Sequence, residues 1–490
     1  MKSKQLTLTI LLISLLSCQN PKKIVINGEI IGNVPEKIEY TVPIHGICNW
    51  AFKDFVQPDS LGKFKIEIET EKEAFIKLMT NSAQGTLIIE PGKTYSVNFD
   101  FNNKEKIFSV TGRNYLFQET YNKLPSPIHI QVGAKEFLYD TIADNIKATI
   151  DKRRTNEIAV FEKFLSDKKI SKNVFEMIKT DRNTYYDAIL STIAWIKDLM
   201  VIEGREKVFP EDFRNLWIET FDQSLITNPE VAKSPWFNFY AESYLYFRDY
   251  MNNDFTKEKL DALNESGQIK IYRVNKAKEY LPSEVRESYI ANYLYQESSQ
   301  KEYEKELIEL FENFKSEYPK SKYIQYISPL IDEIINFHKA SESEFSEKVI
   351  FVKDYQKQKS LTDIAKTLPK GKIYVDVWAT WCGPCISEFK YKEDLKSLLQ
   401  KNNVQILYIS IDRDQDSVQW KNMIKFYNLE GFHLRANKEL QTDLIKIFDN
   451  NGSISIPWHI LIDNNGTILK RHAKGPSQIM QLEEEINISE

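Results

Sequence analysis

The chain has 490 residues, a hydrophobic fraction of 42% and a formal net charge of −5. This length predicts roughly three domains, and the apolar content is sufficient for each to bury a core. No basic patch stands out, which argues against nucleic acid as a partner, and four cysteines are too few for a scaffold held together by disulfides.

The N-terminal segment has the pattern of an export signal. Lys2 and Lys4 precede the apolar run 6–16, which is too short to span a bilayer. The run ends in a small residue followed by Cys18. This ending resembles a bacterial lipobox and implies a signal peptide over 1–17 with a lipid on Cys18, so we expect a periplasmic protein of the cell envelope, anchored to a membrane. An ordinary secretory signal with an incidental cysteine is the alternative.

Residues 22–115 have the pattern of strands separated by turns. Segments 64–69 and 95–99 alternate apolar and polar side chains, which is the period of a half-exposed strand. Turn signals lie at 59–62 and 90–92. We therefore expect a small antiparallel β-sandwich in this part of the chain.

Residues 116–349 change to a helical pattern, with apolar side chains recurring at helical spacing among lysines and glutamates. The clearest apolar stripe consists of Tyr303, Leu307, Leu310, Phe314 and Tyr318. Pro319 is expected to end that helix. We find no repeat of fixed period, so the pattern predicts an irregular all-α region. The aromatic stripes are interpreted as packing core, and a hidden ligand site is the less favoured alternative.

The last part of the chain has an α/β pattern. The apolar runs 373–378 and 404–411 have the length of buried strands. A helix over 387–400 would connect them as a crossover, which makes the two strands parallel. A hairpin is expected over 458–470, around an Asp-Asn-Asn-Gly turn, and a closing helix over 477–486.

Two cysteines lie where the first of these strands meets the next helix, in the sequence Trp-Cys-Gly-Pro-Cys over 381–385. The free N–H groups and the dipole at a helix N-terminus favour a thiolate over a thiol, and a thiolate attacks disulfides. Half of a zinc site is one alternative, but it needs two more Cys or His ligands at suitable spacing, and Cys18 and Cys48 lie far upstream. A permanent, inert disulfide is the other, although so small a loop stabilises little.

Strand, Trp-Cys-Gly-Pro-Cys and helix together have the pattern of thioredoxin. The longer string 371–389 more narrowly resembles the TlpA/ResA group of exported thiol-disulfide oxidoreductases. The resemblance covers 350–490 and implies a thioredoxin fold there, while 22–115 resembles the β-domain that often precedes this module in lipoproteins of the group. The whole chain is thus expected to be multidomain: β-sandwich, all-α region over 116–349, and α/β thioredoxin fold.

The resemblance also implies a function. Substrates would be protein thiols and disulfides, and a membrane reductase would be the electron donor. No metal or organic cofactor is expected, since the dithiol itself is the redox centre. The Gly-Pro pair between the cysteines resembles the reducing members of the superfamily, which favours reduction of extracytoplasmic disulfides.

Roles for the cysteines and a nearby acid follow from the same resemblance. Cys382 is the expected attacking thiol, and Cys385 is the resolving thiol that attacks the mixed disulfide and releases the substrate. Asp376 matches a buried acid behind the resolving cysteine. Burial raises the pKa of a carboxyl group, so Asp376 would take the proton of Cys385 through a water near neutral pH. A strand-end aspartate with a satisfied hydrogen bond is the alternative.

Three further candidates are Glu388, Trp381 and the Ile456-Pro457 pair. Glu388 matches a glutamate that tunes the cysteine pair, but Lys390 replaces the proline that the group often has there, so a solvated helix glutamate is equally consistent. Pro457 is expected to be cis and to expose the backbone of Ile456 to a substrate strand. A trans proline opening an edge strand is the alternative. Trp381 is expected on the apolar rim that contacts substrate.

Two other functions compete with this interpretation. Peroxiredoxins share the fold but place a threonine three residues before the peroxide-attacking cysteine, and Ala379 holds that position here. The second rival is a polypeptide- or ligand-binding lipoprotein in which the thioredoxin module is accessory.

Cys48 is expected to be a buried structural thiol, because no charged or helix-terminal setting is visible around it.

Overall fold

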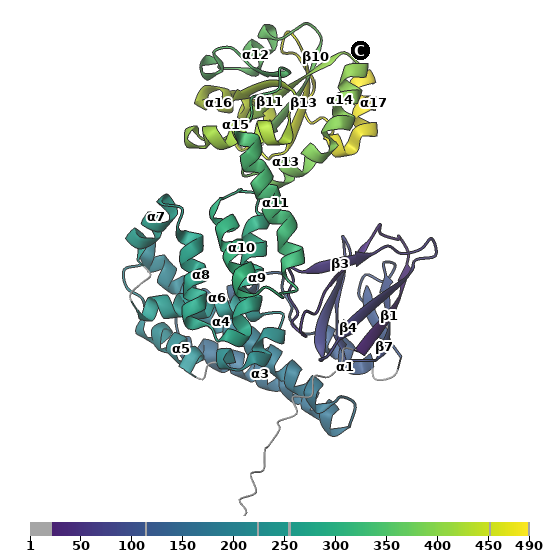
Figure 1. Cartoon of the computed structure of the whole chain (residues 1–490), viewed down its shortest axis with the longest axis vertical. Coiled ribbons are helices and arrows are strands. Elements are labelled where there is room, and N and C mark those ends of the chain that lie inside the picture. Colours follow the sequence, from purple (N-terminus) through teal and green to yellow (C-terminus); the bar gives the residue numbers. More distant parts are fainter. Residues whose placement is uncertain (1–21, 113–114, 223–224, 253–255, 450–451, 489–490) are drawn as a thin grey trace, which may run out of the picture. The chain divides into compact units, whose positions relative to one another are not determined.

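The protein is described by a computed structural model, in which the chain forms two compact units (Figure 1). The described residues are 22–112, 115–222, 225–252, 256–449 and 452–488. The expected signal peptide and Cys18 lie outside them. The first unit runs to Asn292 and takes in Lys320–Tyr323, and the second comprises Tyr293–Pro319 and the residues from Ile324 onward.

Two four-stranded sheets open the first unit. One has the order β4 (Lys63–Thr70), β1 (Lys22–Ile31), β7 (Thr94–Asp100), β8 (Phe108–Thr111), and the other β3 (Lys53–Val56), β2 (Ile38–Thr41), β5 (Ala74–Met79), β6 (Gln84–Ile89). Their inward-facing isoleucine, leucine, valine and phenylalanine side chains form a single apolar core.

The direction of one strand pair corrects the expectation of an antiparallel sandwich. β1 pairs with β4 antiparallel but with β7 parallel, whereas the other pairs in these two sheets are antiparallel. Alternation of apolar and polar residues shows which side chains face the core, but it carries no information on the direction of a neighbouring strand.

Helices make up the next part of the chain, and the described residues from 115 to 341 contain no strand. The helices are α1 (Tyr115–Asn122), α2 (Ile130–Ala134), α3 (Ala143–Ser166), α4 (Lys172–Ile202), α5 (Glu211–Asp222), α6 (Phe237–Met251), α7 (Lys257–Glu265), α8 (Ile269–Tyr280), α9 (Ser283–Ser299), α10 (Glu306–Glu317) and α11 (Ile324–Ser341). Most apolar side chains of α4 are buried. No helix among the described residues is both long enough and apolar enough to cross a bilayer.

The last two of these helices, α10 and α11, belong to the second unit. Leu307, Leu310 and Phe314 of the predicted apolar stripe are buried on α10, which ends just before Pro319, as expected. The other two members of the stripe lie outside the helix: Tyr303 precedes it and is buried, and Tyr318 follows it and is half-buried. Tyr303 stacks on Phe337 of α11 with ring centroids 4.2 Å apart. Phe426 of α15 (Ser417–Tyr427) packs against both rings at 5.5 Å. An aromatic cluster therefore joins α11 to the C-terminal part of the chain.

A six-stranded sheet forms the centre of the second unit. Its order is β14 (Ile468–Lys470), β13 (Trp458–Asp463), β10 (Lys372–Trp378), β11 (Val404–Ser410), β12 (Gly431–Arg435), β9 (Val349–Phe351). β10 is parallel to β11, and β13 and β14 form a hairpin, so both predicted pairings are confirmed. α12 (Leu361–Thr367) and α16 (Lys438–Phe448) cover one face, and α14 (Lys392–Lys401) and α17 (Ile479–Ile488) the other (Figure 1).

The helix after the cysteine motif is interrupted, which corrects the expectation of one helix over 387–400. α13 (Gly383–Glu388) passes into a 3₁₀ turn over Phe389–Tyr391 before α14 begins. The turn contains Lys390 and no proline. Phe389 is buried there against Trp378 and Tyr427, a tertiary contact that helical periodicity does not reveal.

Candidate active site

The disulfide lies where β10 gives way to α13. Cys382 and Cys385 are joined, with Cα atoms 5.3 Å apart. Cys382 caps α13, and its Sγ accepts a hydrogen bond from the backbone N–H of Cys385 at 3.2 Å. Cys382 is 4% exposed and Cys385 1%, while Trp381 between strand and helix is 62% exposed. The disulfide therefore lies just beneath a surface marked by an exposed indole.

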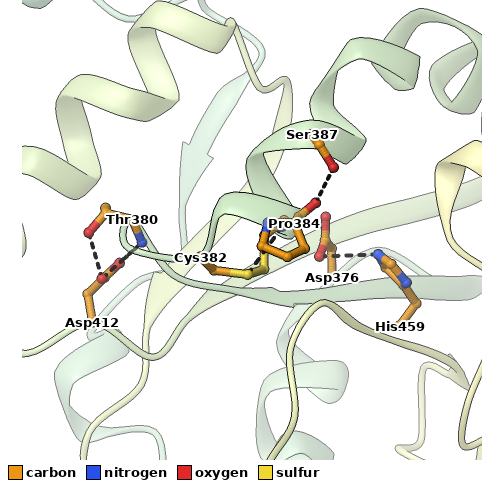
Figure 2. The surroundings of a disulfide bond; sticks show 8 residues. Asp376, Thr380, Cys382, Pro384, Ser387, Asp412 and His459 are labelled. Atoms are coloured by element: carbon orange, nitrogen blue, oxygen red, sulfur yellow. Dashed lines mark hydrogen bonds and ion pairs between the residues drawn. A yellow bond between two sulfur atoms is a disulfide. The ribbon is translucent and has the colours of Figure 1, made fainter. Parts of the chain in front are cut away.

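The loop before the disulfide is held by an aspartate for which the sequence indicates no role at this site. Asp412, which follows β11, accepts hydrogen bonds from the backbone N–H and the hydroxyl of Thr380 at 2.8 to 3.1 Å (Figure 2). Ser410 donates a further bond at 2.7 Å. Burial raises the pKa of Asp412, and the Ser410 and Thr380 bonds oppose that rise. The conformation of the residue before Trp381 is thus set by this carboxylate.

A buried acid lies on the strand that leads into the motif. Asp376 is 2% exposed and shares a buried side of β10 with Tyr374 and Trp378, as parity predicts. Burial and the nearby Glu388 carboxylate raise its pKa to about 7. Its Oδ1 lies 3.5 Å from Nε2 of His459 (Figure 2). Asp376 can therefore exchange a proton near neutral pH.

Glu388, at the end of α13, is bound to another element. Its carboxylate accepts hydrogen bonds from the backbone N–H and the hydroxyl of Ser477, both at 2.8 Å, and the residue is only half-exposed. Glu388 is therefore hydrogen-bonded to another element while it remains in part accessible to solvent. Ser477 belongs to the 3₁₀ turn Pro476–Gln478 before α17, eighty-nine residues further along the chain.

The proline that opens β13 is in the expected conformation. The Ile456–Pro457 peptide bond is cis. Ile456 is half-buried and packs against the apolar core between the sheet and α12 and α16. The role of this backbone in binding substrate is taken up below.

A groove runs beside the exposed indole, within the second unit. Its volume is about 810 Å³. The active-site wall includes Trp381, Gly383 and Lys390, and the opposite wall consists of 299–302 together with Glu333, which is paired with Lys301. We call this the active-site groove. No motif in the sequence points to its second wall, because residues 299–302 precede the cysteines by about eighty positions and Glu333 by about fifty.

The remaining cysteine among the described residues is inert. Cys48 is 3% exposed, and burial raises its pKa to about 12, so it is a thiol at neutral pH. Among the described residues no group of three or more His, Cys, Asp and Glu side chains is placed to hold a metal ion.

Comparison with known proteins finds relatives of the C-terminal part of the chain. The Redoxin family profile matches residues 340–486. The thiol-disulfide oxidoreductases ResA of Bacillus thuringiensis subsp. konkukian and of Bacillus cereus (strain ATCC 10987) are each 34% identical over 116 residues. The C-terminal region thus matches the Redoxin family profile and is similar in sequence to ResA thiol-disulfide oxidoreductases.

The family profile and the two ResA alignments cover only part of the chain. The two ResA alignments cover 24% of this chain and 62% of each relative, so the chain spans less than two thirds of the curated relatives it matches. The solution structure of a thiol:disulfide interchange protein from Bacteroides sp. is 22% identical, covering 26% of this chain and 78% of that one, with a TM-score of 0.21.

Proposed function

We propose that the chain is a thiol-disulfide oxidoreductase whose redox centre is the Cys382–Cys385 pair. The observation that carries the proposal is the disulfide at the start of α13, just beneath the exposed Trp381. A proton acceptor, Asp376, lies on the strand that leads to it, with a pKa of about 7. The attacking thiol, the resolving thiol and the base therefore all come from one short segment of the chain, residues 376–385.

The reaction runs in two exchange steps in the reducing direction. The Cys382 thiolate attacks a substrate disulfide, forms a mixed disulfide and displaces one substrate thiolate. Cys385 then gives its proton to Asp376, and its thiolate attacks Sγ of Cys382. The second substrate thiolate leaves, and the two cysteines close the disulfide seen in the structure. Two electrons from an external dithiol donor, by analogy a membrane reductase, restart the cycle.

We propose that substrate proteins bind around Trp381. The cis Ile456–Pro457 bond would present the Ile456 backbone to an extended substrate segment. The active-site groove continues from the same indole, and its 810 Å³ would hold side chains next to the substrate disulfide. We therefore expect the substrates to be polypeptides. A polypeptide has a backbone that can pair with Ile456 and side chains that can enter the active-site groove.

The location of the reaction is part of the proposal. The charged and apolar pattern before Cys18, with lipid on that cysteine, would place the protein on the periplasmic side of the cell envelope, where disulfides persist. Labelling with a radioactive fatty acid tests this directly: incorporation in the wild type and none in Cys18→Ala is expected.

The activity is tested by reduction of insulin disulfides with a dithiol as electron donor. Wild-type protein should accelerate insulin reduction, and Cys382→Ser should reduce the rate to that of the dithiol alone. Cys48→Ser is the matched control, because Cys48 is buried and protonated, and it should keep the wild-type rate. Equal rates for Cys382→Ser and wild type would favour the binding lipoprotein instead.

A further inference from the structure

Four titratable side chains form a row across the six-stranded sheet. The register pairs His433 of β12 with Tyr408 of β11, Tyr408 with Asp376 of β10, and Asp376 with His459 of β13. Side chains that are direct partners in adjacent strands point to the same face. All four are buried. The exchange chemistry above uses Asp376, but it gives His459 no part.

His459 and Asp376 face each other in the buried interior. Nε2 of His459 lies 3.5 Å from Oδ1 of Asp376, and neither atom has a hydrogen-bond partner among the described residues. The residues are 6% and 2% exposed. The distance exceeds a hydrogen bond by a few tenths of an ångström, and catalytic hydrogen bonds are often long before substrate binds.

The orientation of the His459 ring is set by its neighbours. The ring stacks on Tyr374, with centroids 5.5 Å apart and an interplanar angle of 13°. Gly475 also lies next to the ring, and an added Cβ there would approach Nδ1 of His459 at 3.3 Å and Oε2 of Glu388 at 3.2 Å. The second ring nitrogen and the Glu388 carboxylate therefore border the same small space, which only a glycine leaves open.

Glu388 extends this arrangement towards solvent. Its carboxylate is bound by Ser477, which is exposed. The buried Asp376, the His459 imidazole and the Glu388 carboxylate thus follow one another from the interior towards the surface.

Burial keeps the His459 imidazole neutral near pH 7. Burial lowers its pKa to about 4, and the Glu388 carboxylate opposes that shift. Burial raises the pKa of the flanking tyrosines. A neutral imidazole accepts a proton at one nitrogen and donates one at the other. The titratable groups that face His459 are Asp376 and Tyr374 on β10 and Glu388 on α13. Beyond them, Tyr408 on β11 interacts with Asp376, and Glu485 on α17, which is paired with Lys470 on β14, interacts with Tyr374.

We propose that His459 is a positioning residue that carries the proton taken up by Asp376 out to the surface by way of Glu388. The inference rests on the proposed function. After Cys385 has given its proton to Asp376, the Asp376 O–H donates to Nε2, and Nδ1–H gives its proton to the Glu388 carboxylate, which releases it to water. Asp376 regains its charge, His459 returns to neutrality in the other tautomer, and no electrons move.

Kinetics of the two exchange steps test the relay in the full chain. The probe is a fluorescent peptide disulfide, and attack by Cys382 is measured alone in the Cys385→Ser background. His459→Gln should slow resolution about tenfold, a modest share of what proton transfer contributes, and flatten its dependence on pH near neutrality. The attack rate should be unchanged.

His433→Gln is the matched control. His433 is also a buried strand histidine stacked on a tyrosine, at 4.9 Å and 9° from Tyr408, with a pKa lowered to about 4 by burial. Its Nε2 faces the Leu429 carbonyl, 2.8 Å away, and it is not a register partner of Asp376. Both steps should run at the wild-type rate in this variant.

A double-mutant cycle separates a relay from a merely structural role. If His459 acts through Asp376, His459→Gln has no further effect in an Asp376→Asn background. An equal slowing in both backgrounds, or a slowed attack step, would overturn the relay.

A measurement on the wild type covers the case in which the variant does not fold. The ¹⁵N shifts of His459 should report a change of tautomer as Asp376 titrates, and shifts that stay constant across that range would overturn the relay. If His459→Gln forms the mixed disulfide and resolves it at the normal rate, the relay is wrong but the exchange chemistry stands. If wild-type protein forms no mixed disulfide, the exchange chemistry falls and the relay with it.

Discussion

Single residues around the disulfide are held in environments that change their chemistry. Asp376 is a carboxylic acid in a nearly dry position, and its pKa of about 7 follows from burial first and from Glu388 second. The same burial that makes it a proton acceptor near neutral pH is unfavourable to its ionised form. Asp412 is also buried, but it is surrounded by donors from Thr380 and Ser410.

The cost of ionising Asp376 predicts a pH-dependent gain in stability for Asp376→Asn. The folded pKa is raised, so the folded protein binds the proton more tightly than the unfolded chain, and the penalty is present above pH 7 and vanishes below the unfolded pKa. We expect the variant to be more stable than wild type by on the order of 2–4 kcal/mol at about pH 8.5, with the difference shrinking as the pH falls. Urea unfolding of the oxidised proteins measures it, and a constant difference would contradict the assignment.

The Asp412 bonds predict a loss of stability in Asp412→Ala. Replacing the carboxylate leaves the N–H and hydroxyl of Thr380 without their acceptor, which should cost about 2–4 kcal/mol. Asp412→Asn keeps one acceptor oxygen and should cost less. Denaturant unfolding checks both, and an alanine variant as stable as wild type would show that the loop is held by other contacts.

Elements differ in how far the sequence predicted them. β10, β11 and the β13–β14 hairpin follow from apolar runs and a turn signal. The strands β9 and β12 were not predicted, because β9 has three residues and β12 contains His433 and Arg435 among few apolar positions. The 3₁₀ turn between α13 and α14 and the parallel pairing of β1 with β7 depend on tertiary contacts, which the pattern of apolar residues does not reveal.

The site was predicted to the same extent. The cysteines and Asp376 lie within one short segment, and Pro457 directly precedes an apolar run that predicts a strand, so the sequence indicates them. Other contacts of the site join residues that are far apart in the chain: Asp412 lies 32 residues from Thr380, and Ser477 lies 89 residues from Glu388. Only the fold brings such pairs together, and the second wall of the active-site groove is hidden for the same reason.

The active-site groove predicts discrimination between large and small substrates. Gln300→Trp places an indole in the groove opposite Trp381, so the KM for insulin should rise about tenfold, the lower end of the discrimination that a small misfit in an apolar pocket produces. The rate with oxidised glutathione should not change, because so small a disulfide does not need the groove. Lys305→Trp, exposed and outside the groove, is the control. Equal effects on both substrates would contradict a binding role.

At the scale of the whole molecule, the chemistry is concentrated in the second unit. Cys48 lies in the first unit and is buried with a pKa of about 12, so reduced native protein should alkylate at Cys382 and leave Cys48 unmodified for at least about a hundredfold longer. Mass spectrometry of tryptic peptides reads both sites. Rapid modification of Cys48 would mean that the β-sheets open readily or that a third thiol takes part.

The two compact units divide the chain differently from the three predicted domains. The composition suggests domains over 22–115, 116–349 and 350–490, and this division remains a proposal. The compact units place α10 and α11 with the C-terminal sheet, through the cluster of Tyr303, Phe337 and Phe426. Limited proteolysis should therefore leave these two helices attached to the thioredoxin-like domain.

Trapping of the mixed disulfide tests the central claim most directly. In Cys385→Ser the resolving thiol is absent, so incubation with a disulfide-bonded polypeptide should leave the substrate covalently attached to Cys382, as peptide mapping would show. Attachment that persists in Cys382→Ser/Cys385→Ser, or none in Cys385→Ser at neutral pH, would contradict the claim that Cys382 begins the exchange.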